Sequence, residues 1–162
     1  STLNKKEVSL QTVNEVFTFF FSGKLYGIWP QDLLEIVEDT PYVPVPNSPD
    51  FLAGIINSHG KVVSVVDLTK ILKRHNLSLG AKRRVAILNN DDFMLGMLVP
   101  IDLTISFYSE KSAEVKDNAK IEFFKMFRLR SKDNNYDINI LEPNELFEYL
   151  KNFFKNRTIA QI

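Results

Sequence analysis

Residues 54–68 read GIINSHGKVVSVVDL, and this stretch decides how the chain is expected to fold. Apolar, mostly β-branched residues stand on both sides of Asn57-Ser58-His59-Gly60, a tetrapeptide whose residue types favour tight turns. The pattern predicts a β-hairpin with strands over residues 53–56 and 61–66. Asp67 follows the second strand, and its carboxylate can cap a helix over about residues 68–75. The stretch therefore predicts a hairpin that runs directly into a short helix.

Two more hairpins are predicted, one on each side of this stretch. Residues 17–21 and 25–29 flank the turn Ser22-Gly23-Lys24, and residues 84–88 and 93–99 flank a turn rich in Asn and Asp. Towards the C-terminus, apolar residues predict a further pair of strands and then a helix that begins at Pro143, where proline favours the first helical position. The ranges of the two strands are residues 121–130 and 136–141.

The remaining segments show no strand pattern. Leu33, Leu34 and Ile36 follow Pro30 at a spacing that predicts a short helical turn over residues 31–37. Four prolines fall within residues 40–50 and predict a stiff, extended connector. The charged residues 108–120 are predicted to form a loop.

Two motifs occur twice, which predicts a duplicated unit. Residues 27–33 are similar to residues 96–103, and Val65-Val66-Asp67 is similar to Ile140-Leu141-Glu142, at offsets of 70 and 75 residues. Each unit would contain about five short strands followed by a helix. The expected fold is thus mostly β, with two five-stranded barrels, short helices and a C-terminal helix. The expected parts are a flexible leader over 1–14, a single domain over 15–155 with two intertwined subdomains (about 15–80 and 81–155), and a tail over 156–162.

The composition excludes several classes of site. The chain of 162 residues has no cysteine and two histidines, which excludes thiol catalysis, Cys-based zinc or iron–sulfur sites and a His-rich metal centre. Lys and Arg number 20, as do Asp and Glu, so the formal net charge of zero argues against a dedicated nucleic-acid or anionic-membrane binder. No cofactor or metal is expected. The sequence shows no targeting segment and no stretch long enough to insert into a membrane, so a cytoplasmic protein is expected.

Catalytic candidates are few. Ser58, His59 and Asp67 invite comparison with a Ser-His-Asp triad. Adjacent side chains in a tight turn rarely face each other, and no nucleophile elbow accompanies them, so we interpret them as turn residues. The chain is therefore not expected to be an enzyme.

Two kinds of binding surface remain. Lys125, Arg128 and Arg130 interleave with phenylalanines, as on an OB-like surface that binds single-stranded nucleic acid, although an edge strand would have the same pattern. Leu33, Leu34 and Ile36 alternate with acidic residues, as in a shallow apolar groove that accepts a partner helix, although a short helix covering the end of a barrel would have the same pattern.

Several motifs together resemble the CheW family, the scaffold proteins of bacterial chemotaxis arrays. The likeness covers about residues 15–155. The matching motifs, in chain order, are Tyr26-Gly27-Ile28, Leu33-Leu34-Glu35-Ile36, Pro44-Val45-Pro46, Gly54-Ile55-Ile56-Asn57-Ser58-His59-Gly60, Ser64-Val65-Val66-Asp67-Leu68, Gly96-Met97-Leu98-Val99 and Ile140-Leu141-Glu142-Pro143.

This resemblance implies two five-stranded, SH3-like β-barrels without enzymatic activity. It implies an adaptor that joins the cytoplasmic tip of methyl-accepting chemoreceptors to the regulatory domain of the histidine kinase CheA, at arrays on the inner face of the membrane. The kinase contacts would lie on barrel ends and are not assigned to residues. The implied receptor groove consists of Leu33, Glu35, Ile36, Asn57, His59, Leu98 and Val99.

The chain departs from the family pattern at several positions. His59 stands where the family has Arg, Ser64 where it has Pro, and Pro100 where it has Asp. Phe124-Lys125-Met126 replaces a Lys-Gly pair near the last strands. These departures are expected to change the choice of partner.

Overall fold

The computed structural model describes residues 13–21, 23–38, 41–71, 83–89, 94–100, 102, 104–109, 113–121, 124–131 and 137–161. Of the predicted leader, only residues 13 and 14 are among them, and both belong to the first strand. In this part of the chain, no helix has the length and apolar character needed to cross a bilayer.

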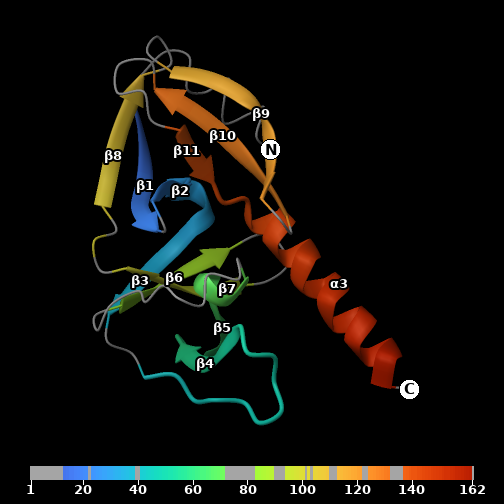
Figure 1. Ribbon diagram of the computed structural model, residues 1–162. Helices are drawn as coiled ribbons and strands as arrows, with labels where there is room; N and C mark the ends of the chain where they lie inside the picture. The colour runs from blue at the N-terminus through green and yellow to red at the C-terminus, as the bar shows by residue number, and fades with distance from the viewer. Residues whose placement is uncertain are drawn as a thin grey trace.

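The fold is mostly β, as the sequence predicts, and its strands form two sheets (Figure 1). In the described part of the chain, sheet A has six strands in the order β8-β1-β2-β11-β10-β9, and sheet B has five in the order β3-β6-β7-β5-β4. The elements are β1 (Val13–Phe21), β2 (Lys24–Ile28), the 3₁₀ turn η1 (Pro30–Asp32), β3 (Leu33–Glu38), β4 (Leu52–Ser58), β5 (Lys61–Asp67), α2 (Leu68–Ile71), β6 (Arg83–Asn89), β7 (Met94–Pro100), β8 (Thr104–Ser109), β9 (Ala113–Ile121), β10 (Phe124–Ser131), β11 (Asp137–Ile140) and α3 (Pro143–Gln161).

The predicted duplication is visible in how the strands pair. Parallel pairing joins β2 to β11, with Gly27 opposite Ile140, and joins β5 to β7, with Gly96 opposite Val65. The two glycines are equivalent in the sequence repeat, and so are Val65 and Ile140. Each sheet therefore combines one hairpin from one half of the chain with strands from the other half. Consequently the sheets do not follow a division into 15–80 and 81–155: sheet A takes β1 and β2 from the first half, and sheet B takes β6 and β7 from the second.

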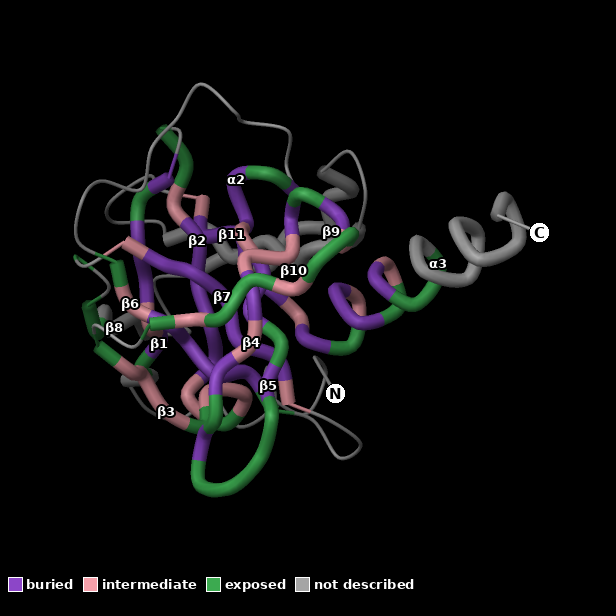
Figure 2. Tube along the Cα trace, turned by 90° about the horizontal axis from the view of Figure 1, so that it is seen from below, coloured by how far each residue is buried: buried purple, intermediate pink, exposed green. Residues whose placement is uncertain are grey.

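The hydrophobic clusters repeat this symmetry. Among the described residues, one cluster lies within sheet A and includes Val16 and Ile140, and a second lies within sheet B and includes Val85 and Val65. Val16 lies beside Gly27 and Val85 beside Gly96, so the two valines take corresponding places. A third and larger cluster takes residues from both sheets and from α2 and α3. Buried residues accordingly run through the middle of the molecule (Figure 2).

The hairpin predicted over residues 53–56 and 61–66 is present as β4 and β5, and the predicted helix cap follows it. Asp67 Oδ1 accepts hydrogen bonds from the Thr69 backbone N–H at 2.9 Å and from Thr69 Oγ1 at 2.6 Å. The cap predicted at Asp67 is thus confirmed. The described part of this helix ends at Ile71, so the rest of the range predicted to residue 75 lies outside the described residues.

Three sequence predictions about secondary structure are wrong. Residues 33–37 belong to strand β3, and only the preceding Pro30–Asp32 is a 3₁₀ turn. A bulge between Leu33 and Glu35 explains the error, because the extra residue turns Leu33 and Ile36 to the same face at a spacing that resembles a helix. Most of the predicted loop at 108–120 lies in strands, and α3 continues to Gln161 through the predicted tail.

Gly27 and Gly96 allow the strands to approach closely. A Cβ at Gly27 would lie 2.8 Å from both Ile138 Cγ2 and Ile140 Cδ1, and one at Gly96 would lie 3.0 Å from Val85 Cγ1. Neither position has room for a methyl group without a shift of its neighbours. The pairing of β2 with β11 and the pairing of β5 with β7 thus each require a glycine at this position.

We predict that Gly27→Ala lowers the free energy of unfolding by about 1–3 kcal/mol, the usual cost of overpacking a core. Urea denaturation followed by circular dichroism measures this loss. Ile140→Val removes one of the methyl groups that the new Cβ would meet, so its own cost should be smaller in the Gly27→Ala background than in the wild type. Equal stability of Gly27→Ala and wild type would contradict this close approach.

Candidate functional site

The residues that the resemblance assigns to a groove come from three places in the structure. Leu33, Glu35 and Ile36 lie on β3, Asn57 and His59 lie on the β4–β5 hairpin, and Leu98 and Val99 lie on β7. The structure brings the first two groups together and separates the third from them.

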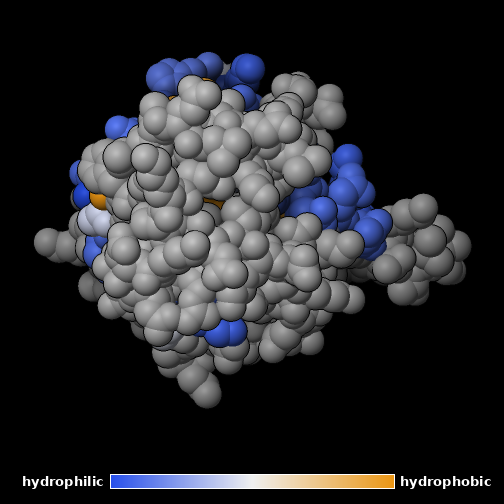
Figure 3. Space-filling model, turned by 90° about the horizontal axis from the view of Figure 1, so that it is seen from above, coloured by the Kyte–Doolittle hydropathy of each residue, from blue (hydrophilic) through white to orange (hydrophobic). Residues whose placement is uncertain are grey.

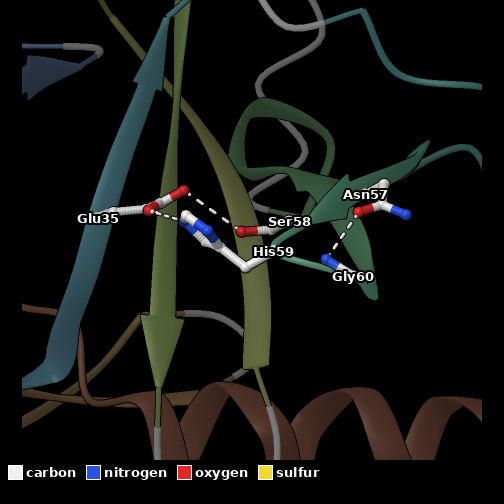
Figure 4. Close-up of polar contacts among 5 residues, drawn as sticks. All are labelled: Glu35, Asn57, Ser58, His59 and Gly60. Atoms are coloured by element: carbon white, nitrogen blue, oxygen red, sulfur yellow. Dashed lines mark hydrogen bonds and ion pairs between the residues drawn. The ribbon is translucent and has the colours of Figure 1, made fainter.

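Glu35 connects β3 to the tip of the β4–β5 hairpin (Figure 4). Its Oε2 lies 2.9 Å from His59 Nε2, and its Oε1 accepts a hydrogen bond from Ser58 Oγ at 3.3 Å. Because β3 and β4 are the first and last strands of sheet B, these contacts link the two edges of the sheet. Glu35 thereby joins the two edge strands of sheet B at this end of the sheet.

The hairpin turn holds His59 in place. His59 has a φ of 51° and Gly60 a φ of 81°, so both turn residues are left-handed, as a two-residue hairpin with the right-handed strand twist requires. Histidine tolerates this conformation better than most residues. Asn57 Oδ1 accepts a hydrogen bond from the Gly60 backbone N–H at 3.0 Å, and in Figure 4 its side chain points away from Glu35. Asn57 therefore braces the turn.

The contact between Glu35 and His59 faces solvent. The His59 side chain is 79% exposed and the Glu35 side chain 33% exposed. An exposed pair contributes only about 0–1 kcal/mol to stability, because water screens it and both side chains lose freedom. The contact consequently contributes little to the stability of the fold. Its main effect is to hold the side chains of Glu35 and His59 in place on the surface. That surface combines a carboxylate and an imidazole.

Apolar side chains lie next to this pair on β3. Leu33 and Ile36 are half-buried and pack against the cluster shared by both sheets. Leu34, at the bulge, is 51% exposed. The groove implied by the resemblance does not include Leu34, nor does it include Ser58, which binds Glu35. Leu34 is apolar and stands between two groove positions in the sequence, which could have indicated that it belongs to the surface. The bulge that exposes its side chain is not visible in the sequence.

Leu98 and Val99 do not belong to this surface, and their assignment to the groove is wrong. Leu98 is 2% exposed within the sheet B cluster, and Val99 is fully buried in the cluster shared by both sheets. Successive residues of β7 point to opposite faces of sheet B, and each face is covered by one of these clusters. Neither residue can contact a partner unless the core opens.

The polar residues of the hairpin do not form a catalytic triad. Ser58 Oγ and His59 Nε2 each bind a different oxygen of Glu35, whereas Asp67 caps α2. A triad requires the nucleophile to bond to the base and the base to bond to the carboxylate. Within the described ranges, no group of three or more His, Asp or Glu residues is placed to hold a metal ion.

We predict that Glu35→Ala loosens the hairpin tip while costing less than about 1 kcal/mol of global stability. Amide hydrogen exchange at His59, Gly60 and Lys61 should become about two- to fivefold faster, because the link to β3 is lost. Glu38→Ala is the matched control: it removes another partly exposed pair on the same strand, in which Glu38 Oε1 lies 3.2 Å from Arg84 Nη2. If both variants changed exchange at the tip equally, Glu35 would not hold the hairpin.

The sequence was compared with family models and with known proteins. The family model described as the CheW-like domain matches residues 15–116. The chain is 30% identical over 93 residues to the chemotaxis protein CheW of Klebsiella aerogenes, covering 55% of this chain and 54% of that protein. It is 24% identical over 84 residues to protein FrzA of Myxococcus xanthus, covering 52% of each. The matched part thus spans about half the length of these relatives.

A solved structure shows the same fold. The crystal structure of the scaffolding protein TtCheW from Thermoanaerobacter tengcongensis matches with a TM-score of 0.67 and 23% sequence identity, over 82% of this chain and 86% of that chain. The mostly β, SH3-like fold with two subdomains that the sequence predicts is therefore confirmed, although sheet A has six strands where five were expected. Because the family model covers more than half of the chain, including β2 to β8 and the contacts of Glu35, the chain belongs to the family of CheW-like domains.

Proposed function

We propose that this chain is a non-catalytic adaptor that couples chemoreceptors to the histidine kinase CheA in a bacterial chemotaxis array. The match to the CheW-like domain carries the proposal, and the names of the relatives, a chemotaxis protein and a scaffolding protein, support it. We place the protein in the cytoplasm, at receptor arrays on the inner face of the membrane.

The receptor-binding surface in this proposal consists of Leu34, Glu35 and His59, with Leu33 and Ile36 beside them. The exposed Leu34 offers an apolar contact, and Glu35 with His59 offers polar ones. A surface with an apolar centre and a charged rim suits a helical partner. We assign this surface to the chemoreceptor tip, which is one of the two partners of the proposed adaptor.

The alternative of an OB-like protein that binds single-stranded nucleic acid is less well supported. The formal net charge is zero, whereas such binding depends on an excess of cationic side chains along a groove. The basic residues that suggested it lie on β10, between β9 and β11, and their side chains are outside the described ones.

The first test uses Leu34→Asp. A carboxylate in an apolar contact lacks a partner, so we expect the affinity for a purified chemoreceptor signalling fragment to fall at least tenfold, with binding to the CheA regulatory domain unchanged. Val43→Asp is the matched control because Val43 is also exposed and apolar but lies on the connector before β4. Equal receptor affinities of wild type and Leu34→Asp would remove Leu34 from the surface.

The second test uses His59→Arg. Arginine carries a permanent charge and a planar set of donors, so it can bind Glu35 and a receptor carboxylate at the same time. One regained hydrogen bond of about 1 kcal/mol corresponds to roughly fivefold tighter binding of the same receptor fragment at fixed salt. His59→Gln retains a donor without a positive charge and serves as the control. An unchanged affinity for His59→Arg would make residue 59 a turn residue only.

A further inference from the structure

Two polar residues lie on the face of sheet B that carries its hydrophobic cluster. On β4, Ser58 stands two residues after Ile56, so both side chains point to the same side of the strand, towards this cluster. On β3, Glu35 lies opposite Ile87, which is fully buried in the same cluster. Ser58 and Glu35 therefore meet at the end of the cluster, next to the hairpin tip.

The Ser58 hydroxyl is buried and depends on Glu35. Ser58 is 6% exposed, and its Oγ donates a hydrogen bond to Glu35 Oε1 at 3.3 Å (Figure 4). In the part of the chain that the structure describes, this hydroxyl has no other hydrogen-bond partner. A buried hydroxyl without a partner is costly, so this bond accounts for a polar residue at an inward-facing position. Because Ser58 is almost fully buried, any influence it has on a partner protein must pass through Glu35.

The two oxygens of the Glu35 carboxylate have different partners. Oε1 accepts the bond from Ser58, and Oε2 lies 2.9 Å from His59 Nε2. The last torsion of a glutamate side chain has a broad distribution, so one contact leaves the carboxylate free to rotate. A second contact, from another residue, fixes the plane of the carboxylate. A single guanidinium could bind both oxygens, whereas the imidazole of His59 reaches one and Ser58 supplies the other donor.

A fixed carboxylate plane matters for the surface described above. The Glu35 side chain is 33% exposed, and its neighbour Leu34 is 51% exposed. The two oxygens of a carboxylate offer about four lone-pair positions, so acceptor positions remain after the bonds to Ser58 and His59. With the plane fixed, these positions keep one direction relative to Leu34. A partner that uses both residues then meets them in a single arrangement.

We propose that Ser58 is a positioning residue of the receptor surface. Its hydroxyl holds Glu35 Oε1 from the buried side, so that Oε2 meets His59 and the carboxylate is presented to the receptor in one orientation. This inference rests on the proposed function, because it explains how a residue that the receptor hardly touches determines the affinity for it. The burial of Ser58, its single partner and the division of the Glu35 oxygens between two residues are the observations behind it.

The test is a double-mutant cycle between Ser58→Ala and Glu35→Ala in the full chain, measured by the affinity for the purified chemoreceptor signalling fragment. We expect each single variant to bind the fragment about three- to tenfold more weakly, which corresponds to the loss of one hydrogen bond. The double variant should bind no more weakly than Glu35→Ala alone, because Ser58 acts only through Glu35. Ser64→Ala is the matched control: Ser64 lies on the same hairpin, opposite Ile55, and is exposed, so this variant should bind like the wild type.

Amide hydrogen exchange at Gly60 and Lys61 measures the same coupling without a partner protein. Ser58→Ala should make this exchange about two- to fivefold faster, as Glu35→Ala does, because the carboxylate no longer holds the hairpin tip in place. The two substitutions together should add nothing further. Alanine fits into the space of serine, so the fold should persist.

The outcomes separate this inference from the function on which it rests. Ser58→Ala that binds the receptor fragment as tightly as the wild type overturns the inference. A double variant in which the two losses add in full also overturns it, because Ser58 would then act by a route other than Glu35, and so does Ser64→Ala that weakens binding as much as Ser58→Ala. Wild type that does not bind the receptor fragment contradicts the proposed function itself, and exchange at the hairpin tip then still decides whether Ser58 positions Glu35.

Discussion

The parallel pairing of β2 with β11 and of β5 with β7 is the constraint on which the rest of the structure depends. It forces each half of the chain to complete the sheet of the other half, so neither sheet can form from one half alone. The neighbouring side chains can pack closely against these strands because Gly27 and Gly96 have no side chain. The cluster shared by both sheets follows from this exchange, and α3 packs on it after leaving β11.

The exchange also determines where the proposed receptor surface lies. Sheet B begins with β3 and ends with β4, so its two edges come near each other at the hairpin tip, where Glu35 joins Ser58 and His59. At the base of the same hairpin, α3, which follows β11 of sheet A, lines a cavity together with residues of β4, β5 and β7. On the face shown in Figure 3, the described residues that reach the surface are mostly hydrophilic.

The sequence predicted the features that depend on neighbouring residues. The hairpins, the cap at Asp67 and the helix start at Pro143 each rely on a few adjacent side chains, and all three are found. Features that depend on distant contacts were missed. Leu98 and Val99 are buried because a hydrophobic cluster packs on each face of β7. The strand from Ala113 was missed because its charged residues are typical of an edge strand. The bond from Ser58 to Glu35 joins residues 23 positions apart.

The proposed function requires this one domain to hold the receptor and the kinase at the same time, on separate surfaces. Sedimentation velocity of the full chain mixed with both a chemoreceptor signalling fragment and the CheA regulatory domain tests it most directly. We predict a complex whose mass equals the sum of all three components, with each partner binding the chain as tightly in the presence of the other as alone. Two binary complexes that replace each other as one partner is added in excess would contradict the account.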